Sequence, residues 1–213
     1  MENLKKMMLM LVCIAFMGAI TSCLSDNDNE DNVYTLTPSQ KAAQIFEMGG
    51  TFYGHLFFTN DSTLKLDSIP CVWNLSAKDS VLSIPNFPVE LFANGIYDNN
   101  IKQSLLNGGT VPFNAVVHPY YNNNHTKGYY TFWTLVDDDK MQFTLNNDGT
   151  SHDVTVNFAY QMTVYHNWAN GATFSSIGEY MDNEFLAYIL VKDVIFDGKT
   201  CKTTWPSYIY GKK

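Results

Sequence analysis

The chain reads Lys140-Met-Gln-Phe-Thr-Leu-Asn-Asn-Asp-Gly-Thr-Ser-His-Asp-Val-Thr-Val-Asn-Phe-Ala-Tyr160 across its clearest structural signal. Apolar residues occupy every second position up to residue 145, and the alternation resumes after residue 153. Because successive side chains of a strand point to opposite faces, each half predicts a strand with one apolar and one polar face. Asn147-Asp-Gly-Thr150 supplies a turn between them, so the sequence predicts a β-hairpin with one face in water.

Further segments with strand character lie on both sides of this hairpin. They occupy residues 51–58, 64–66, 71–76, 81–84, 110–118, 128–136, 184–196 and 203–210. The segment 184–196 is long and apolar on both faces, so we expect a central strand there, and we expect the last segment at a sheet edge. About nine short strands at this spacing predict a mainly β fold, either an antiparallel β-sandwich or a barrel.

Two short helical segments interrupt the β pattern. Thr37-Pro-Ser-Gln40 has the residues of an N-cap and a capping box, and Gly49-Gly50 ends the predicted helix. Within residues 86–109, Pro88 opens one helical turn and Asp98 caps another. We therefore expect an N-terminal helix and a short helical insertion that covers one end of the sheet.

The N-terminal residues are typical of an exported protein. Residues 1–22 hold Lys5 and Lys6, then an apolar run from residue 7 to residue 20, then two small residues. This is the pattern of a secretory signal peptide, and the run is shorter than the ~20 apolar residues of a membrane span. Thr21-Ser22-Cys23 resembles a bacterial lipobox, which implies a diacylglycerol anchor on Cys23. The alternative is an ordinary signal peptide with a chance cysteine.

Residues 23–34 are polar and acidic, with Asp26, Asp28, Glu30 and Asp31 among them. So few apolar side chains cannot support a fold, which predicts a disordered tether. The segment resembles the acidic signal that follows the lipidated cysteine in Bacteroidetes lipoproteins of the outer face of the outer membrane. A plain spacer, which leaves the protein on the periplasmic side, is the alternative. Residues 35–213 then form a single β-rich domain.

Composition narrows the class of partner. The net charge is −8, and the 13 basic residues are all lysines. Arginine provides most bidentate recognition of phosphates and carboxylates, so neither nucleic acid nor an anionic lipid surface is expected as a partner. Aromatic residues make up 15% of the chain and charged residues only 16%, which favours a β-rich extracellular domain over a helical cytoplasmic enzyme.

Two of the four cysteines remain unassigned once Cys13 leaves with the signal peptide and Cys23 carries the lipid. These are Cys71 and Cys201, so one intramolecular disulfide can form. An oxidising compartment permits it. Two separate buried thiols are the alternative.

Three patches resemble an uncharacterised family of Bacteroidetes surface lipoproteins, a domain of unknown function. They are Leu36-Thr-Pro-Ser-Gln40 with Gly50-Thr-Phe-Tyr-Gly54, Asn86-Phe-Pro-Val-Glu-Leu-Phe-Ala-Asn94, and Val194-Ile-Phe-Asp-Gly-Lys199. The resemblance implies an envelope compartment and a β-rich architecture. It implies no activity and no catalytic residue.

Three short patterns resemble the Asp-Ser/Thr-apolar acceptor of Bacteroidetes protein O-glycosylation. They are Asp61-Ser-Thr63, Asp67-Ser-Ile69 and Asp79-Ser-Val81, with Ser62, Ser68 and Ser80 as the acceptor residues. Ordinary turn chemistry, in which Asp and Ser cap strand ends, is the alternative.

No segment has the spacing of a known catalytic or metal motif. None of the five histidines stands in a zinc-ligand pattern, and no nucleophile elbow, phosphate loop or dinucleotide fingerprint occurs. Asp137-Asp-Asp139 is expected in a turn, because consecutive strand residues alternate faces. The sequence therefore predicts no catalytic residue, no metal ligand and no cofactor.

Aromatic residues outside clean alternation are the remaining candidates for ligand contact. They are Tyr120, Tyr121, Tyr129, Tyr130, Trp133, Trp168 and Trp205. We assign Tyr120, Tyr121 and Trp168 to ligand contact, since amphipathic rings suit sugar and protein partners. Packing across strands is the alternative.

These observations favour a lipid-anchored cell-envelope lipoprotein, exposed at the cell surface, that acts as a non-enzymatic binding module for a glycan or an envelope protein. One alternative is a glycan-acting hydrolase, because a pair of catalytic carboxylates leaves no local motif. Another is a lipocalin-like barrel that carries a small hydrophobe.

Overall fold

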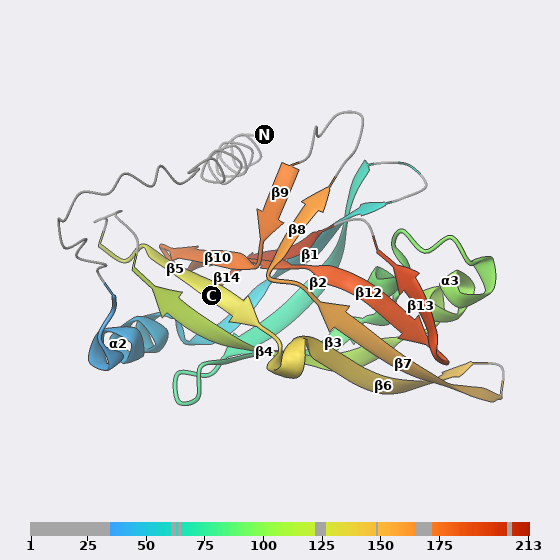
Figure 1. The fold of residues 1–213 in the computed structure, drawn as a ribbon. Coiled ribbons are helices and arrows are strands. Elements are labelled where there is room, and N and C mark those ends of the chain that lie inside the picture. Colours follow the sequence, from blue (N-terminus) through green and yellow to red (C-terminus); the bar gives the residue numbers. More distant parts are fainter. Residues whose placement is uncertain are drawn as a thin grey trace.

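A computed structural model describes residues 35–60, 63, 65–121, 127–147, 149–164, 172–203 and 206–213. Eight antiparallel strands close a barrel, next to a four-stranded sheet and a two-stranded hairpin (Figure 1). The barrel strands, in spatial order, are β1 (Gly50–Asn60), β14 (Ser207–Lys212), β11 (Glu184–Ile189), β10 (Ile177–Met181), β5 (Tyr130–Leu135), β4 (Thr110–Tyr120), β3 (Val81–Pro88) and β2 (Lys65–Leu75). The mainly β prediction is confirmed, and the architecture is a barrel with additional sheets.

The four-stranded sheet contains the hairpin that the sequence predicts most clearly. Its order is β13 (Lys199–Lys202), β12 (Val191–Phe196), β7 (Thr150–Phe158) and β6 (Lys140–Asn147). Strands β6 and β7 pair from Lys140 opposite Asn157 to Asn147 opposite Thr150. The separate hairpin consists of β8 (Gln161–Val164) and β9 (Ala172–Ser175).

Strand β2 corrects one prediction, because segments expected as two strands form one. Pro70 lies inside it, opposite His55 of β1. On its other edge β2 pairs with β3 only at Asn74 and Leu75. The missing N–H of Pro70 therefore removes no bond on that edge, and the strand continues through it.

Two predictions at the C-terminal end are also corrected. The segment expected as one central strand is divided at Leu190 between β11 of the barrel and β12 of the second sheet. Strand β11 is buried on both faces, whereas β12 is buried at Val191, Val194 and Phe196 and exposes Lys192. Strand β14 is not an edge strand, because it lies between β1 and β11 and closes the barrel.

Aromatic side chains fill the barrel interior. The ring of Phe185 lies 5.0 Å from Phe52, 4.9 Å from Phe132 and 6.0 Å from Trp73, measured between centroids. All four side chains are fully buried and come from four different barrel strands. Such a filled interior disfavours the lipocalin-like alternative, which needs an open lumen.

Helix α2 (Pro38–Met48) covers one end of the barrel (Figure 1). The predicted capping box is present, with Thr37 Oγ1 accepting from the Gln40 N–H at 3.3 Å. The helix buries Ile45 and Met48. The carbonyl of Glu47 accepts from the Tyr180 hydroxyl at 3.3 Å and from Lys213 Nζ at 2.7 Å, which binds the helix to β10 and to the end of β14.

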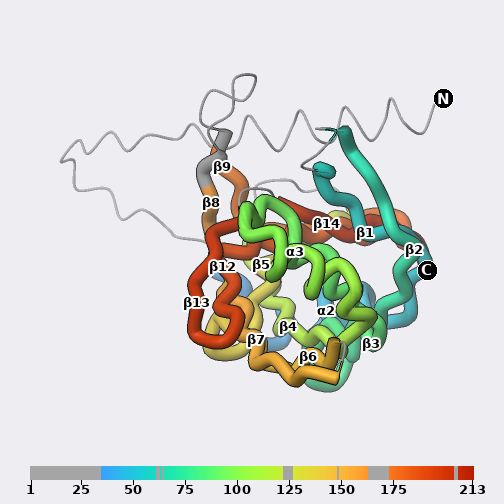
Figure 2. The backbone as a smooth tube through the Cα atoms, turned by 90° about the vertical axis from the view of Figure 1, so that its right-hand side faces the viewer, coloured from blue at the N-terminus to red at the C-terminus, as the bar shows by residue number. Residues whose placement is uncertain are grey.

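The predicted helical insertion covers the opposite end. It consists of the 3₁₀ turn η1 (Val89–Ala93) and helix α3 (Asn99–Leu106), and Figure 2 shows α3 in front of the barrel strands. Asp98 caps α3 by accepting from the Ile101 N–H at 3.2 Å, and Lys199 of β13 lies 2.5 Å from its second oxygen. The remaining short helical turn, η2 (Asp137–Asp139), holds the three consecutive aspartates between β5 and β6.

Candidate functional site

A row of side chains crosses the outer face of the barrel. Strand register places the following residues opposite one another in turn: Thr131, Glu179, Leu186, Tyr210 and His55. Their sequence neighbours Phe132, Phe185 and Ile209 are buried in the interior, so this row points outward. Glu179 is the one carboxylate in the row.

Glu179 lies in a small hollow on that face, which we call the Glu179 pocket. Its volume is about 10 Å³, and its lining residues are Tyr129, Glu179, Met181, Glu184, Leu186 and Tyr210. Burial raises the pKa of Glu179, and a hydrogen bond from the Tyr129 hydroxyl partly opposes that rise. The site therefore holds a half-buried carboxylate beside two tyrosine hydroxyls.

A second carboxylate, Glu184, differs from Glu179 in the groups that contact it. It lies opposite Met181, so it is the diagonal neighbour of Glu179, a position with Cα atoms about 7–8 Å apart. The Tyr210 hydroxyl donates to it at 2.5 Å, and Lys212 Nζ lies 2.5 Å from its other oxygen. Burial and the Glu184 charge both raise the pKa of Tyr210. Glu184 is thus bonded to a hydroxyl and an ammonium group, whereas Glu179 accepts from the Tyr129 hydroxyl.

Aromatic rings extend the site on both sides. The predicted ligand contact Tyr120 lies 5.6 Å from Trp133, and burial raises its pKa, with a smaller contribution from the Glu179 charge. Tyr121 is half-buried at the adjoining position. On the other side, Tyr208 stacks on Phe57 with 4.9 Å between ring centroids. The structure therefore brings Tyr120 to the site that contains Glu179.

Other predicted site residues lie elsewhere. Cys71 is buried in β2 and Cys201 is half-buried in β13, and both are free, so the structure does not join them. Ser68 is exposed in β2, whereas Ser80 is half-buried in a tight turn with φ of 62°. The remaining predicted residues, Cys23, Ser62 and Trp168, lie outside the described residues.

The sequence did not single out Glu179 or Glu184. The available signal was a pair of carboxylates in otherwise apolar strands on either side of Asp182-Asn183. Both turn residues have positive φ, 53° and 67°, as the tight turns of hairpins require. That turn sets Met181 opposite Glu184 and thereby brings the two carboxylates together.

The described ranges contain no group of three or more His, Cys, Asp or Glu side chains that could hold a metal ion. In the same ranges no helix has the length and apolar character needed to cross a membrane.

The fold and the site define a small antiparallel β-barrel protein with an acidic, aromatic outer face. The chain belongs to the family described as "Domain of unknown function (DUF4840)", whose match spans residues 47–181, more than half of the chain. The matched part includes β1 to β10 and Glu179, and Glu184 and Tyr210 follow it. No curated protein and no solved structure matches the chain.

Proposed function

We propose that this protein is a lipid-anchored lipoprotein of the cell envelope that binds a glycan on the outer face of its barrel. The observation that carries the binding site is the half-buried Glu179 carboxylate between Tyr129, Tyr210 and the Tyr120–Trp133 pair. Sugars present hydroxyl donors and apolar C–H faces together. A carboxylate accepts from the former, and tyrosine or tryptophan rings cover the latter.

A glycan fits this site better than an envelope protein does. A stable protein partner covers on the order of 800 Å² per side, usually around a well-packed apolar centre. The Glu179 pocket is a small hollow of about 10 Å³ with mostly apolar walls, one half-buried carboxylate and rings beside it. A sugar ring would therefore lie over the hollow and against the neighbouring rings, with one hydroxyl directed at Glu179.

The experiment is a glycan array with the purified protein, followed by calorimetric titration of each bound glycan. Glu179→Gln removes the charged acceptor and is expected to weaken binding by about tenfold or more. Tyr120→Ala is expected to weaken binding through lost ring contact. Tyr97→Ala is the matched control, because Tyr97 is 92% exposed beside α3 and remote from the barrel face. Equal affinities of Glu179→Gln and the wild type would contradict the site.

The anchor is tested separately. Signal peptide 1–22, Cys23 and the acidic tether 23–34 support placement in the outer membrane of Bacteroidetes, at the cell surface. Cys23→Ser should abolish lipidation and membrane fractionation. Neutralising Asp26, Asp28, Glu30 and Asp31 together should leave the lipid but turn the protein to the periplasmic side, where added protease cannot reach it. If these substitutions leave protease cleavage in whole cells unchanged, the four acidic residues are not the signal for surface exposure.

A second candidate function, glycan hydrolysis, is favoured by one observation. Glu179 and Glu184 line the same pocket, as acid and base carboxylates do, and burial raises the pKa of Glu179. Glu184, however, is already bonded to Tyr210 and Lys212, and the hollow is shallow for a catalytic cleft. Product analysis of every bound glycan decides between binding and hydrolysis. Turnover that Glu184→Gln abolishes would show that the protein is a hydrolase and not only a binding module.

A further inference from the structure

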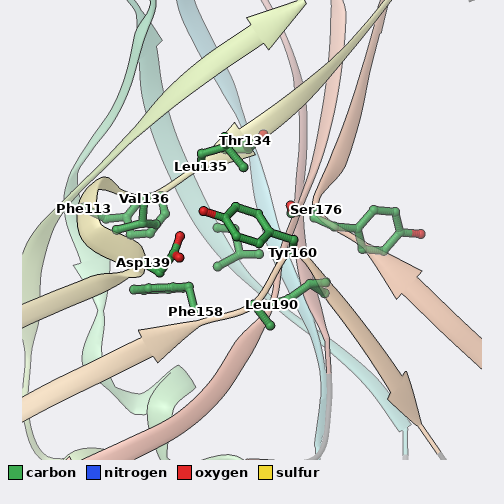
Figure 3. A pocket seen from close by; sticks show the side chains of 12 residues that line it. Phe113, Thr134, Leu135, Val136, Asp139, Phe158, Tyr160, Ser176 and Leu190 are labelled. Carbon is green, nitrogen blue, oxygen red and sulfur yellow. The ribbon is translucent and has the colours of Figure 1, made fainter. Parts of the chain in front are cut away.

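A second hollow lies where the barrel meets the four-stranded sheet. It has a volume of about 10 Å³, which is space for about one water molecule. Figure 3 shows Tyr160 across it, and we call it the Tyr160 pocket. Its walls are mostly apolar and include Phe113, Leu135, Val136, Phe158, Ile189 and Leu190.

Two buried hydroxyl groups, those of Ser176 and Thr134, line this pocket. Ser176 is 3% exposed and Thr134 is 6% exposed. Neither Ser176 Oγ nor Thr134 Oγ1 has a hydrogen-bond partner among the described residues. The Thr134 N–H donates to the Ser176 carbonyl at 3.0 Å, which fixes the two residues side by side. Because native proteins rarely leave buried hydroxyls unsatisfied, a bound group is expected between them.

The mouth of the pocket selects against charge. The Tyr160 hydroxyl donates to the Asp139 carboxylate, and Figure 3 shows the tyrosine ring between Asp139 and Ser176. Among the described residues that line the pocket none is basic, and Asp139 is the acidic one. An anion would meet apolar walls and a negative charge, and a cation would find only two neutral hydroxyls inside.

We propose that the Tyr160 pocket binds the hydroxyl of a small neutral molecule, with Ser176 and Thr134 as its hydrogen-bond partners. A hydroxyl both donates and accepts, so it satisfies both side chains at once. Water and a short alcohol share this chemistry. Water occupies the pocket in the absence of alcohol, and the alcohol replaces it with its carbon against the apolar walls. This site is separate from the Glu179 pocket.

The test is protein NMR of the purified full chain with three probes: methanol, acetate and xenon. Without a probe, a nuclear Overhauser effect from long-lived water to the Thr134 methyl group is expected. Methanol should shift the amide signals of Ser176, Thr134 and Leu190 in a saturable way, and acetate should not. Thr134→Val with Ser176→Ala should lose the water signal and weaken methanol binding by about tenfold or more.

Two further variants keep the test decisive if the double variant folds poorly. Thr134→Ser retains the hydroxyl and should retain saturable methanol binding, although it lacks the methyl group that reports the water. Ser207→Ala removes a buried hydroxyl that already donates to the Ile189 carbonyl at 3.1 Å, and should leave the pocket unchanged. A dry pocket that admits xenon but not methanol would overturn the proposal. So would methanol affinity that is equal in the wild type and in a folded Thr134→Val variant.

Discussion

Gly54 lies directly opposite Gly211 where β1 pairs with β14, and the Trp73 ring occupies the space that a side chain at position 211 would need. A Cβ atom on Gly54 would be 2.1 Å from the Tyr210 carbonyl oxygen, and one on Gly211 would be 2.6 Å from the Trp73 ring. The two glycines therefore permit the pairing that closes the barrel.

Gly211→Ala should lower the free energy of unfolding by about 1–3 kcal/mol, because the added methyl group has no space beside Trp73. Urea denaturation measures this loss. Gly109→Ala is the control, since its Cβ meets no atom within 4 Å and only its φ of +67° is unfavourable, at roughly 1 kcal/mol. A smaller loss at position 211 than at position 109 would contradict the close approach.

Phe185→Ala should lower the free energy of unfolding by about 3–5 kcal/mol, because it removes the ring that Phe52, Phe132 and Trp73 contact. Tyr53→Ala, on the same barrel but 66% exposed, should change it by less than about 0.5 kcal/mol. Thermal unfolding followed by near-UV circular dichroism reports both. Equal losses would show that the barrel interior is not the main core.

Thr37→Ala should cost about 1 kcal/mol, because it removes the hydroxyl that caps α2. Thr37→Ser retains the capping oxygen and should restore most of the loss. Hydrogen exchange of the α2 amides should rise in the alanine variant before that of the barrel strands. Uniform acceleration across the protein would instead mean that α2 and the barrel unfold together.

Glu179→Gln should change the pH dependence of stability. The folded state raises the Glu179 pKa, so the carboxyl binds more protons folded than unfolded. Wild-type stability therefore falls as pH rises from the unfolded pKa, about 4.3, through the raised folded value. The glutamine variant lacks this decline and gains stability relative to wild type at pH 7. Parallel denaturation curves at pH 4 and pH 7 measure the difference.

At acidic pH, stability should depend on Asp98, and the direction of this dependence should be opposite to that of Glu179. The bond from Lys199 and the helix N-cap lower the pKa of Asp98, so its contribution is present above the unfolded pKa and is lost as pH falls through the folded value. Asp98→Asn should flatten the loss of stability below about pH 4. A wild-type slope in the variant would exclude this contribution.

The two thiols should differ in reactivity. Burial raises the pKa of Cys71 to about 11, and Cys201 is more accessible with a smaller rise of its pKa. Iodoacetamide at pH 8 should modify Cys201 first and Cys71 only after unfolding, as peptide mass spectrometry would show. Absence of modification at both residues in unfolded, unreduced protein would instead reveal the disulfide that the sequence permits.

Local patterns predicted most elements of this fold, because they depend on near neighbours. The alternation around Gly149, the capping residues Thr37 and Asp98, and the turn glycines act within a few positions. The sheet that a strand joins does not depend on near neighbours alone. The sequence therefore could not separate β11 from β12 at Leu190 or place β14 inside the barrel. The carboxylates were missed because the sequence pattern predicted no strand over residues 161–183, where β10 carries Glu179, and because Glu179 and Glu184 meet only after strand register is set.

The pairing of β1 with β14 also sets the order in which the chain can acquire its structure. Tyr53 meets Lys212 across nearly the whole described sequence, so ribosomal synthesis exposes the edge of β1 long before its partner strand exists. At about 5–20 residues per second, that interval lasts seconds to tens of seconds. Barrels with such distant pairings fold slowly, on a scale of roughly milliseconds to seconds. A chaperone that shields β1 until β14 arrives would therefore keep this unpaired strand edge from pairing with other chains.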